Sequence, residues 1–327
     1  MIVAKITPCM ENGKCAIGRR LRSGVAFGST EFHVLRATQH VIPEWLFYFW
    51  RFPPTRKLAS VNMTGSAGQK RVPASFLETA DIPLPSLSEQ RRIAGQLDQA
   101  DRLRRTRRYA LELSDSFLPA AFLELFGGYL TPACSSVLND ALALPLSNGF
   151  FEKRSVYGTG VPVIWVDNLY HTVTINLENL RRARATPEQI TAYQLMEGDL
   201  LFTRSSLVRE GIGQINIVPR LFEPTMFECH VIRARVDPKR VNPFYVLGLY
   251  RSSFGKAHIL TRANTATMTT ISQSALEELP CPLPPLSLQE KFADLVERAE
   301  CLRAVQREAL RQADHLFAAL LHRAFSG

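Results

Sequence analysis

Polar and basic side chains gather in three short segments whose residue types suit contact with nucleic acid. In B-DNA, arginine pairs well with guanine and asparagine or glutamine with adenine, while lysine and arginine also bind phosphates. Segments 147–158, 203–209 and 262–267 mix such side chains with turn formers. The candidate contacts in them are Lys153, Arg154, Tyr157, Arg204, Ser205, Ser206, Arg209, Arg262 and Asn264. For each of these residues, an ordinary solvated loop position is the competing interpretation.

The start of the chain supplies a second set of candidates at corresponding positions. They are Lys5, Thr7, Lys14, Lys70 and Arg71. A further basic run lies between Arg91 and Arg108, where seven arginines stand against two aspartates. Such a run could face phosphates. A solvated helix face, or a face that meets an acidic protein surface, explains it equally well.

Catalysis has one candidate motif, at residues 242–245. Its Asn-Pro-Phe-Tyr sequence is one residue away from the Asn-Pro-Pro-Tyr loop that grips the target adenine in DNA adenine methyltransferases. The aligned residues 42–45 are Ile-Pro-Glu-Trp, and a proline is well suited to the first position of a helix. No glycine-rich nucleotide loop, nuclease motif, metal cluster or Ser-His-Asp arrangement stands out. Single residues such as His230 and His258 are more often packed or solvated than catalytic, so we expect no catalytic residue, metal site or cofactor in this chain.

The elements that position these residues are duplicated along the chain. Residues 83–126 align without gaps on residues 282–325 at a constant offset of 199 and are identical at 16 of 44 positions. Unrelated sequences would agree at roughly 3. A second block, 31–37, aligns with 228–234. Each repeat is therefore expected to contain a strand-rich domain, a proline-rich elbow and a long helix.

The elbows, which begin at Pro83 and Pro282, predict where the long helices start. Alternate prolines hold the chain extended, so each helix should begin at a serine N-cap, Ser88 or Ser287. Acidic and amide side chains then favour the positive end of each helix. A kink is expected near Pro119.

Apolar residues at heptad spacing predict that the two helices pack on each other. In the second helix one series is Phe292, Ala299, Gln306, Ala313 and Leu320, and the interleaved series is Leu295, Leu302, Ala309 and Leu316. This spacing is typical of a coiled-coil seam. In the first helix the corresponding stripe is Ile93, Ala100, Leu103, Ala110, Phe117 and Ala121.

Composition is consistent with two domains and a polyanionic partner. The 327 residues have 46% hydrophobic content and a formal charge of +9. Six scattered cysteines form no C-x-x-C pair, which argues against a zinc site or a disulfide framework. The sequence has no signal-peptide pattern and no long apolar span, so we expect a cytoplasmic protein without membrane contact.

Together these motifs resemble one family. The segment 83–93 and its copy from Pro282 look like the conserved regions of type I restriction-modification specificity subunits, the HsdS family. Segments 5–14 and 28–35 resemble part of a target recognition domain of that family, and 198–204 resembles the matching part of a second one.

The resemblance implies a non-catalytic subunit that reads a bipartite, asymmetric double-stranded DNA site. It implies an α+β fold with two mixed α/β target recognition domains, separated by two long helices packed as an antiparallel coiled coil. Methyltransferase subunits and restriction-translocase subunits would dock on it, and S-adenosylmethionine, ATP and Mg²⁺ would bind those partners. A DNA adenine methyltransferase, a truncated non-functional fragment or a pure coiled-coil assembly protein are the alternatives.

The expected domains differ in length. We place the C-terminal part of the first recognition domain at 1–82, the first elbow and helix at 83–130, the complete second recognition domain at 131–281, and the second elbow and helix at 282–327. Because Met1 aligns near Leu200, residues 131–199 have no counterpart in the first repeat. A start assigned too late, a gene fragment or completion by another chain would each explain this, and we favour a wrong or truncated start.

Overall fold

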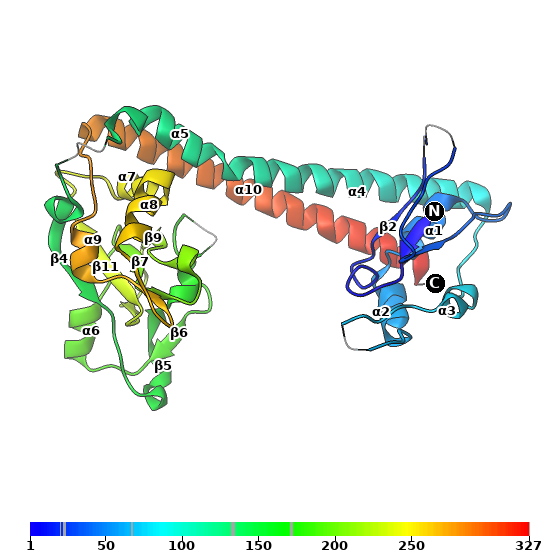
Figure 1. The fold of residues 1–327 in the computed structure, drawn as a ribbon, viewed down its shortest axis with the longest axis horizontal. Coiled ribbons are helices and arrows are strands. Elements are labelled where there is room, and N and C mark those ends of the chain that lie inside the picture. Colours follow the sequence, from blue (N-terminus) through cyan, green and yellow to red (C-terminus); the bar gives the residue numbers. More distant parts are fainter. Residues whose placement is uncertain (20, 22–23, 67, 132–134, 171–172, 327) are drawn as a thin grey trace. The chain divides into compact units, whose positions relative to one another are not determined.

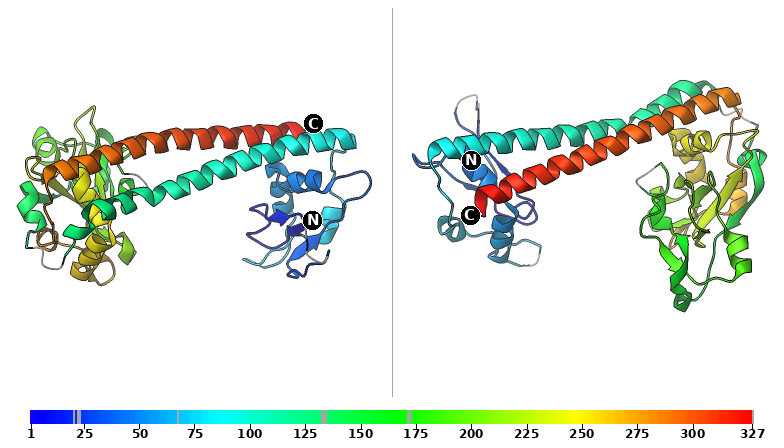
Figure 2. Two further views of the ribbon diagram at one scale, coloured as in Figure 1. Left: turned by 90° about the horizontal axis from the view of Figure 1, so that it is seen from above. Right: turned by 180° about the vertical axis from the view of Figure 1, so that it is seen from behind.

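The computed structural model describes residues 1–19, 21, 24–66, 68–131, 135–170 and 173–326, without the side chain of Arg154. It contains two compact units (Figures 1 and 2). Unit 1 comprises Met1–Leu111 and Val305–Gly327, and unit 2 comprises Glu112–Ala304. The helices α4 (Leu87–Asp115) and α10 (Leu286–Phe325) each begin in one unit and end in the other.

Unit 2 is built on a four-stranded antiparallel sheet in the order β4-β11-β7-β9. Its strands are β4 (Leu142–Asn148), β11 (Val231–Val236), β7 (Leu200–Thr203) and β9 (Ile215–Ile217). Alternate residues of a strand point to opposite faces. Leu200 and Phe202 accordingly lie in the main core, whereas Leu201 lies in a second apolar cluster. Both faces of this sheet are therefore covered.

Two smaller sheets and several helices complete unit 2. The sheets are β10 (Met226–Phe227), β5 (Tyr157–Ile164) and β6 (Arg181–Ala183), and β12 (Asn264–Thr265), β13 (Thr269–Thr270) and β8 (Ser205–Ser206). The α-helices are α5 (Phe117–Phe126), α6 (Pro187–Tyr193), α7 (Pro243–Arg251), α8 (Ser253–Arg262) and α9 (Gln273–Glu277). The 3-10 helices are η1 (Gly127–Tyr129), η2 (Leu138–Ala141), η3 (Arg154–Val156), η4 (Val166–Leu169) and η5 (Arg209–Gly211).

Unit 1 repeats part of this plan. Its antiparallel sheet has the order β2-β1-β3 and contains β2 (Cys15–Ala16), β1 (Ile2–Ala4) and β3 (Phe32–Val34). The helices α1 (Pro43–Phe49), α2 (Pro53–Val61) and α3 (Ala74–Glu78) follow. Segment 31–37 aligns with 228–234, so β3 corresponds to β11 and the order matches β9-β7-β11. Both units thus mix helices and strands, which confirms the predicted mixed α and β content.

In both units, equivalent hydrogen bonds connect the proline-rich elbow to a helix that precedes it in the sequence. We call this set of contacts the joint. In unit 1, Trp45 of α1 donates from Nε1 to the Pro83 carbonyl at 2.8 Å, and the buried Gln90 accepts from the Ile42 amide at 3.1 Å. In unit 2, the Tyr245 hydroxyl donates to the Pro282 carbonyl at 2.7 Å. The buried Gln289 accepts there from the Asn242 amide at 2.8 Å. Gln90 and Gln289, two of the amide side chains near the starts of the long helices, thus satisfy backbone groups at these joints.

Each joint also packs against the far end of the other repeat's helix. In unit 1, Phe325 near the end of α10 lies 4.6 Å from Trp45, measured between ring centroids. In unit 2, Phe126 at the end of α5 lies 4.8 Å from Tyr245. Because Phe126 and Phe325 are related by the offset of 199, the two contacts are equivalent.

The long helices begin one residue before the predicted caps. Their first residues are Leu87 and Leu286. Ser88 and Ser287 therefore lie inside the helices, and the predicted capping is wrong. The hydroxyl of Ser86 accepts instead from the Glu89 amide at 3.3 Å, because Ser86 is the last residue before α4.

The predicted kink near Pro119 is confirmed. The helix is interrupted at Ser116, between α4 and α5. Pro119 has no N–H to donate to the Asp115 carbonyl, and its ring crowds that carbonyl.

Half of the predicted seam on α10 is correct. Phe292 and Ala313 of the first series are buried. In the interleaved series, however, Leu302 is 64% exposed and Leu316 is 48% exposed, so that series is wrong. The buried positions of that series lie one residue later, at Val296 and Phe317. From Phe292 onward the inner face follows spacings of four and then three residues, whereas the prediction used three and then four. Leu103 and Phe117 of the first helix are likewise exposed rather than part of a seam.

Within the described ranges, no helix is both long enough and apolar enough to cross a lipid bilayer.

Candidate nucleic-acid interface

A small sheet in unit 2 brings several of the candidate side chains together. Strand β13 pairs with β8 on one side, where Thr270 faces Ser205, and with β12 on the other, where it faces Asn264. Segments more than fifty residues apart in the sequence therefore meet in one three-stranded element. Ser205 is 9% exposed, whereas Asn264 is exposed. Asn264 can accordingly reach a ligand more readily than Ser205.

Arg204 lies between β7 and β8 and borders an open hollow. Its amide donates to the His230 carbonyl at 2.7 Å, and its Nη1 donates to the Cys229 carbonyl at 3.3 Å. The hollow has a volume of about 410 Å³. It is lined by Asn148, Arg204, Ser272, Gln273, Ser274 and Glu277. This set combines hydrogen-bond donors and acceptors with one cation, which suits base edges and phosphates.

The turn between β10 and β11 contacts β8 and lies near Tyr157. His230 Nδ1 lies 2.6 Å from the Ser205 hydroxyl. Tyr157, at the start of β5, is half-buried and packs its ring 5.3 Å from Trp165. Burial raises the pKa of Tyr157, with smaller contributions from Cys229 and Glu228. The phenol therefore stays neutral near pH 7 and can serve as a hydrogen-bond donor.

The other candidates of unit 2 are more dispersed. Lys153 is exposed just before η3, which begins at Arg154. Arg209 is exposed in η5 and donates to the Leu260 carbonyl at 3.5 Å. Arg262 ends α8 and donates to the Glu278 carbonyl at 3.2 Å. Part of the hydrogen-bonding capacity of Arg262 is therefore used within the protein. The hydroxyl of Ser206 accepts from the Val208 amide at 3.2 Å.

Unit 1 builds the counterpart of the small sheet. The bridge between Ile6 and Arg71 repeats the pairing of Ser205 with Thr270 at the same offset of 199. The Thr7 amide donates to the Lys70 carbonyl at 2.9 Å. Four of the five candidates, Lys5, Thr7, Lys70 and Arg71, therefore lie together. Lys14 lies beside β2, where its carbonyl accepts from the Ala4 amide at 2.9 Å.

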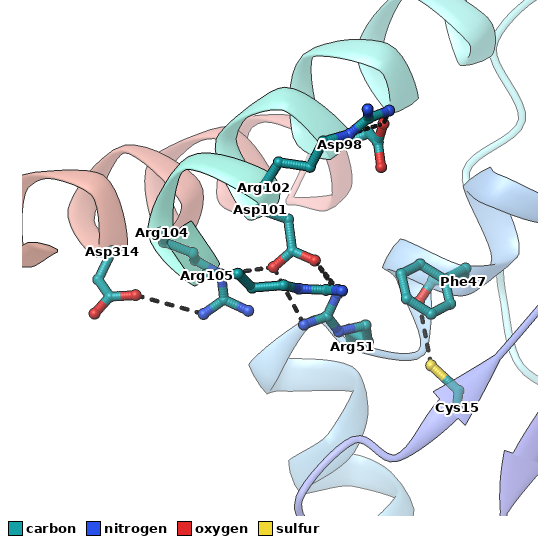
Figure 3. A network of polar contacts seen from close by, with 9 residues as sticks. All are labelled: Cys15, Phe47, Arg51, Asp98, Asp101, Arg102, Arg104, Arg105 and Asp314. Atoms are coloured by element: carbon teal, nitrogen blue, oxygen red, sulfur yellow. Dashed lines mark hydrogen bonds and ion pairs between the residues drawn. The ribbon is translucent and has the colours of Figure 1, made fainter. Parts of the chain in front are cut away.

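Most of the arginines on α4 are engaged in ion pairs within unit 1. Asp101 is 2% exposed and accepts from Arg51 at 2.9 Å, from Arg104 at 2.6 Å and from Arg105 (Figure 3). Although burial disfavours ionisation, hydrogen bonds from Arg51 and Arg104 hold the pKa of Asp101 below its usual value. Outside this network, the same helix pairs Arg92 with Glu89 and Arg102 with Asp98. The arginine run thus owes part of its composition to intramolecular pairing.

The Asn-Pro-Phe-Tyr motif at 242–245 has a structural role. Asn242 caps α7 by accepting from the Phe244 amide at 2.9 Å, and Pro243 is the first helical residue, as predicted. Tyr245 is fully buried and holds the elbow. Neither side chain is free to grip a base.

The comparisons with known proteins agree with one another. Residues 13–113 match the family model described as type I restriction modification DNA specificity domain. The specificity subunit of the type I restriction enzyme EcoAI from Escherichia coli is 48% identical over 92 residues, which cover 28% of this chain and 16% of that protein. The corresponding EcoKI subunit from strain K12 is 24% identical over 314 residues, which cover 90% of this chain and 67% of that protein. The chain therefore matches only a small part of the first of these relatives.

Two solved structures share the fold. One comes from a study of complex assembly and conformational transition of the type I R-M system, with a TM-score of 0.56 and 21% identity over 91% of this chain and 74% of that one. The other is the S subunit of a type I restriction-modification system from M. genitalium. Its TM-score is 0.54 at 13% identity, covering 88% of this chain and 73% of that one.

Proposed function

We propose that this chain, a relative of the specificity subunits of type I restriction-modification systems, reads double-stranded DNA and performs no chemistry itself. One observation carries the proposal. Both repeats form the same small β element, with Lys5 or Arg204 leading into it at an offset of 199. An element duplicated in this way can present similar polar side chains to two stretches of DNA.

The helices suit the role of a spacer in the proposed subunit. In unit 1, Arg104 pairs with Asp314 at 3.5 Å, and in unit 2 the equivalent Arg303 pairs with Asp115. These reciprocal pairs support an antiparallel arrangement of α4 and α5 with α10. We expect methyltransferase and restriction-translocase subunits as partners, and S-adenosylmethionine, ATP and Mg²⁺ on those partners.

Selection from a duplex library with randomised bases tests the proposal. The full chain, together with a methyltransferase subunit, should enrich one bipartite sequence at low salt. Absence of any enriched sequence, with both proteins folded, would contradict recognition. Methyl transfer by the chain alone would instead favour the methyltransferase alternative.

Two variants and one control locate the reading surface. Arg204→Ala and Asn264→Ala should relax or weaken selection, because a good bidentate base contact is worth about 1–3 kcal/mol. If Arg204 binds a phosphate instead, Arg204→Ala should weaken all sequences equally and reduce the salt slope by about 1. Arg240→Ala is the control, since this exposed arginine lies just before α7, outside the small sheet. An equal loss in all three variants would refute the assigned surface.

A further inference from the structure

Glu228 is a buried carboxylate for which the described part of the chain shows no ion pair. It occupies the turn between β10 and β11 and is 1% exposed. Its Oε2 accepts from the His230 amide at 2.9 Å and lies 3.7 Å from Cys229 Sγ. Its Oε1 is buried and has no hydrogen-bond partner in the described part of the chain. A buried carboxylate normally has a compensating partner.

The first repeat has an arginine beside the glutamate of its corresponding turn. Glu31, which matches Glu228 in the sequence alignment, forms an ion pair with Arg71 at 2.9 Å. In the strand register, however, Glu31 accepts from the Lys5 amide where His230 accepts from the Arg204 amide, so Glu31 lies at the place of His230. The position of Arg71 corresponds to Thr270 in the second repeat, because the Ile6–Arg71 bridge and the Ser205–Thr270 pair share one register. The second repeat has therefore replaced the arginine with a neutral threonine.

A second replacement accompanies the first. The residue after Glu31 is Phe32, whereas the residue after Glu228 is Cys229. The second repeat thus has a threonine in place of the arginine and a thiol directly after its glutamate. The thiol and the unpaired Oε1 of Glu228 together favour a metal cation at this turn.

We propose that Glu228, Cys229 and His230 bind a divalent transition-metal ion, with Zn²⁺ as the favoured ion. Each side chain offers one ligand atom, and the three atoms lie within 4.8 Å of one another. Sulfur, imidazole nitrogen and carboxylate oxygen are the donors that zinc uses, and water can occupy a fourth position. The Ser205 hydroxyl, 2.6 Å from Nδ1, orients the His230 ring as outer-shell partners of ligating histidines do.

The ion would neutralise Glu228 and fix the turn that holds Arg204. The carbonyls of Cys229 and His230 both accept from Arg204, so the conformation of the turn determines where this arginine lies. Metal binding itself requires neither DNA nor partner subunits. A failure to bind metal can therefore be distinguished from a failure to recognise DNA, which is the proposed function.

Titration of the metal-stripped full chain with Co²⁺ tests the proposal. Co²⁺ replaces Zn²⁺ in such sites and gives a thiolate-to-cobalt charge-transfer absorption. We expect this band to saturate at one ion per chain and to disappear when Zn²⁺ is added. A folded chain that binds neither ion overturns the proposal.

Two variants introduce the side chains that the first repeat has at the aligned positions. Cys229→Phe should abolish the band, and Thr270→Arg should weaken Co²⁺ binding by bringing a guanidinium close to the ligands. Cys301→Ser is the matched control, since this exposed cysteine lies on α10, and it should leave the band unchanged. Circular dichroism confirms that each variant is folded. A band that persists in folded Cys229→Phe, or is lost only in Cys301→Ser, overturns the assignment.

Discussion

Replacing Asp101 by asparagine tests the ion-pair network that joins Arg51, in the turn between α1 and α2, to α4. The side chains of Arg51 and Arg104 are each 17% exposed, and both would lose the carboxylate of Asp101. Removing one partner of a buried ion pair costs about 3–5 kcal/mol. Because Arg104 also reaches Asp314 at 3.5 Å, we expect a loss at the lower end, about 3 kcal/mol in the free energy of unfolding of unit 1.

Urea denaturation followed by tryptophan fluorescence can measure this loss. The chain has three tryptophans, so a Trp165→Phe background leaves only Trp45 and Trp50, both in unit 1, as reporters. With a denaturant slope of about 2 kcal/mol per molar urea, the midpoint should fall by roughly 1.5 M. Asp98→Asn is the matched control. The side chains of Asp98 and Arg102 are 47% and 76% exposed, so loss of this ion pair should lower the free energy of unfolding by less than about 1 kcal/mol.

The effect of Asp101 should also depend on pH in a defined direction. Its pKa is lower in the folded than in the unfolded protein, so its stabilising contribution is complete above the ordinary aspartate pKa of about 4. The contribution is lost as the pH falls through the folded pKa. The difference between parent and Asp101→Asn should therefore be constant near neutrality and shrink in acid. Equal losses for Asp98→Asn and Asp101→Asn, or a difference that persists in strong acid, would refute the reasoning.

Three further changes test the joints and the cap. Gln289→Leu should destabilise unit 2 by about 2 kcal/mol, measured as faster amide exchange in α7, because it leaves buried backbone groups unpaired. Gly248→Ala should cost about 1–3 kcal/mol in thermal unfolding, since the added Cβ would lie 2.5 Å from the nearest aromatic ring atom. Its control, Gly95→Ala in open space on α4, should be neutral or stabilising. Ser86→Ala should lower the free energy of unfolding by about 1 kcal/mol in urea denaturation, and Ser88→Ala should lower it less. A larger loss for Ser88→Ala than for Ser86→Ala would show that Ser88 is the cap.

The repeat, the elbows and the helix kink could be predicted because they depend on local rules. Proline has no amide hydrogen and a fixed φ, so Pro83, Pro282 and Pro119 act on the backbone wherever they occur. The inner face of α10 was only half predictable. Leucines at 295, 302, and 316 fit a heptad as well as the true positions do, and the partner helix decides which series is buried.

The sequence by itself determined the duplication, the mixed fold and the segments that carry polar side chains, because these follow from residue type and spacing along the chain. Tertiary structure decided which of those side chains are free and which are engaged. Only folding places Asp101 against Arg51, and only folding places Thr270 where the first repeat has Arg71. These contacts join residues far apart in sequence. Their energies depend on burial and on the partner, neither of which residue spacing contains.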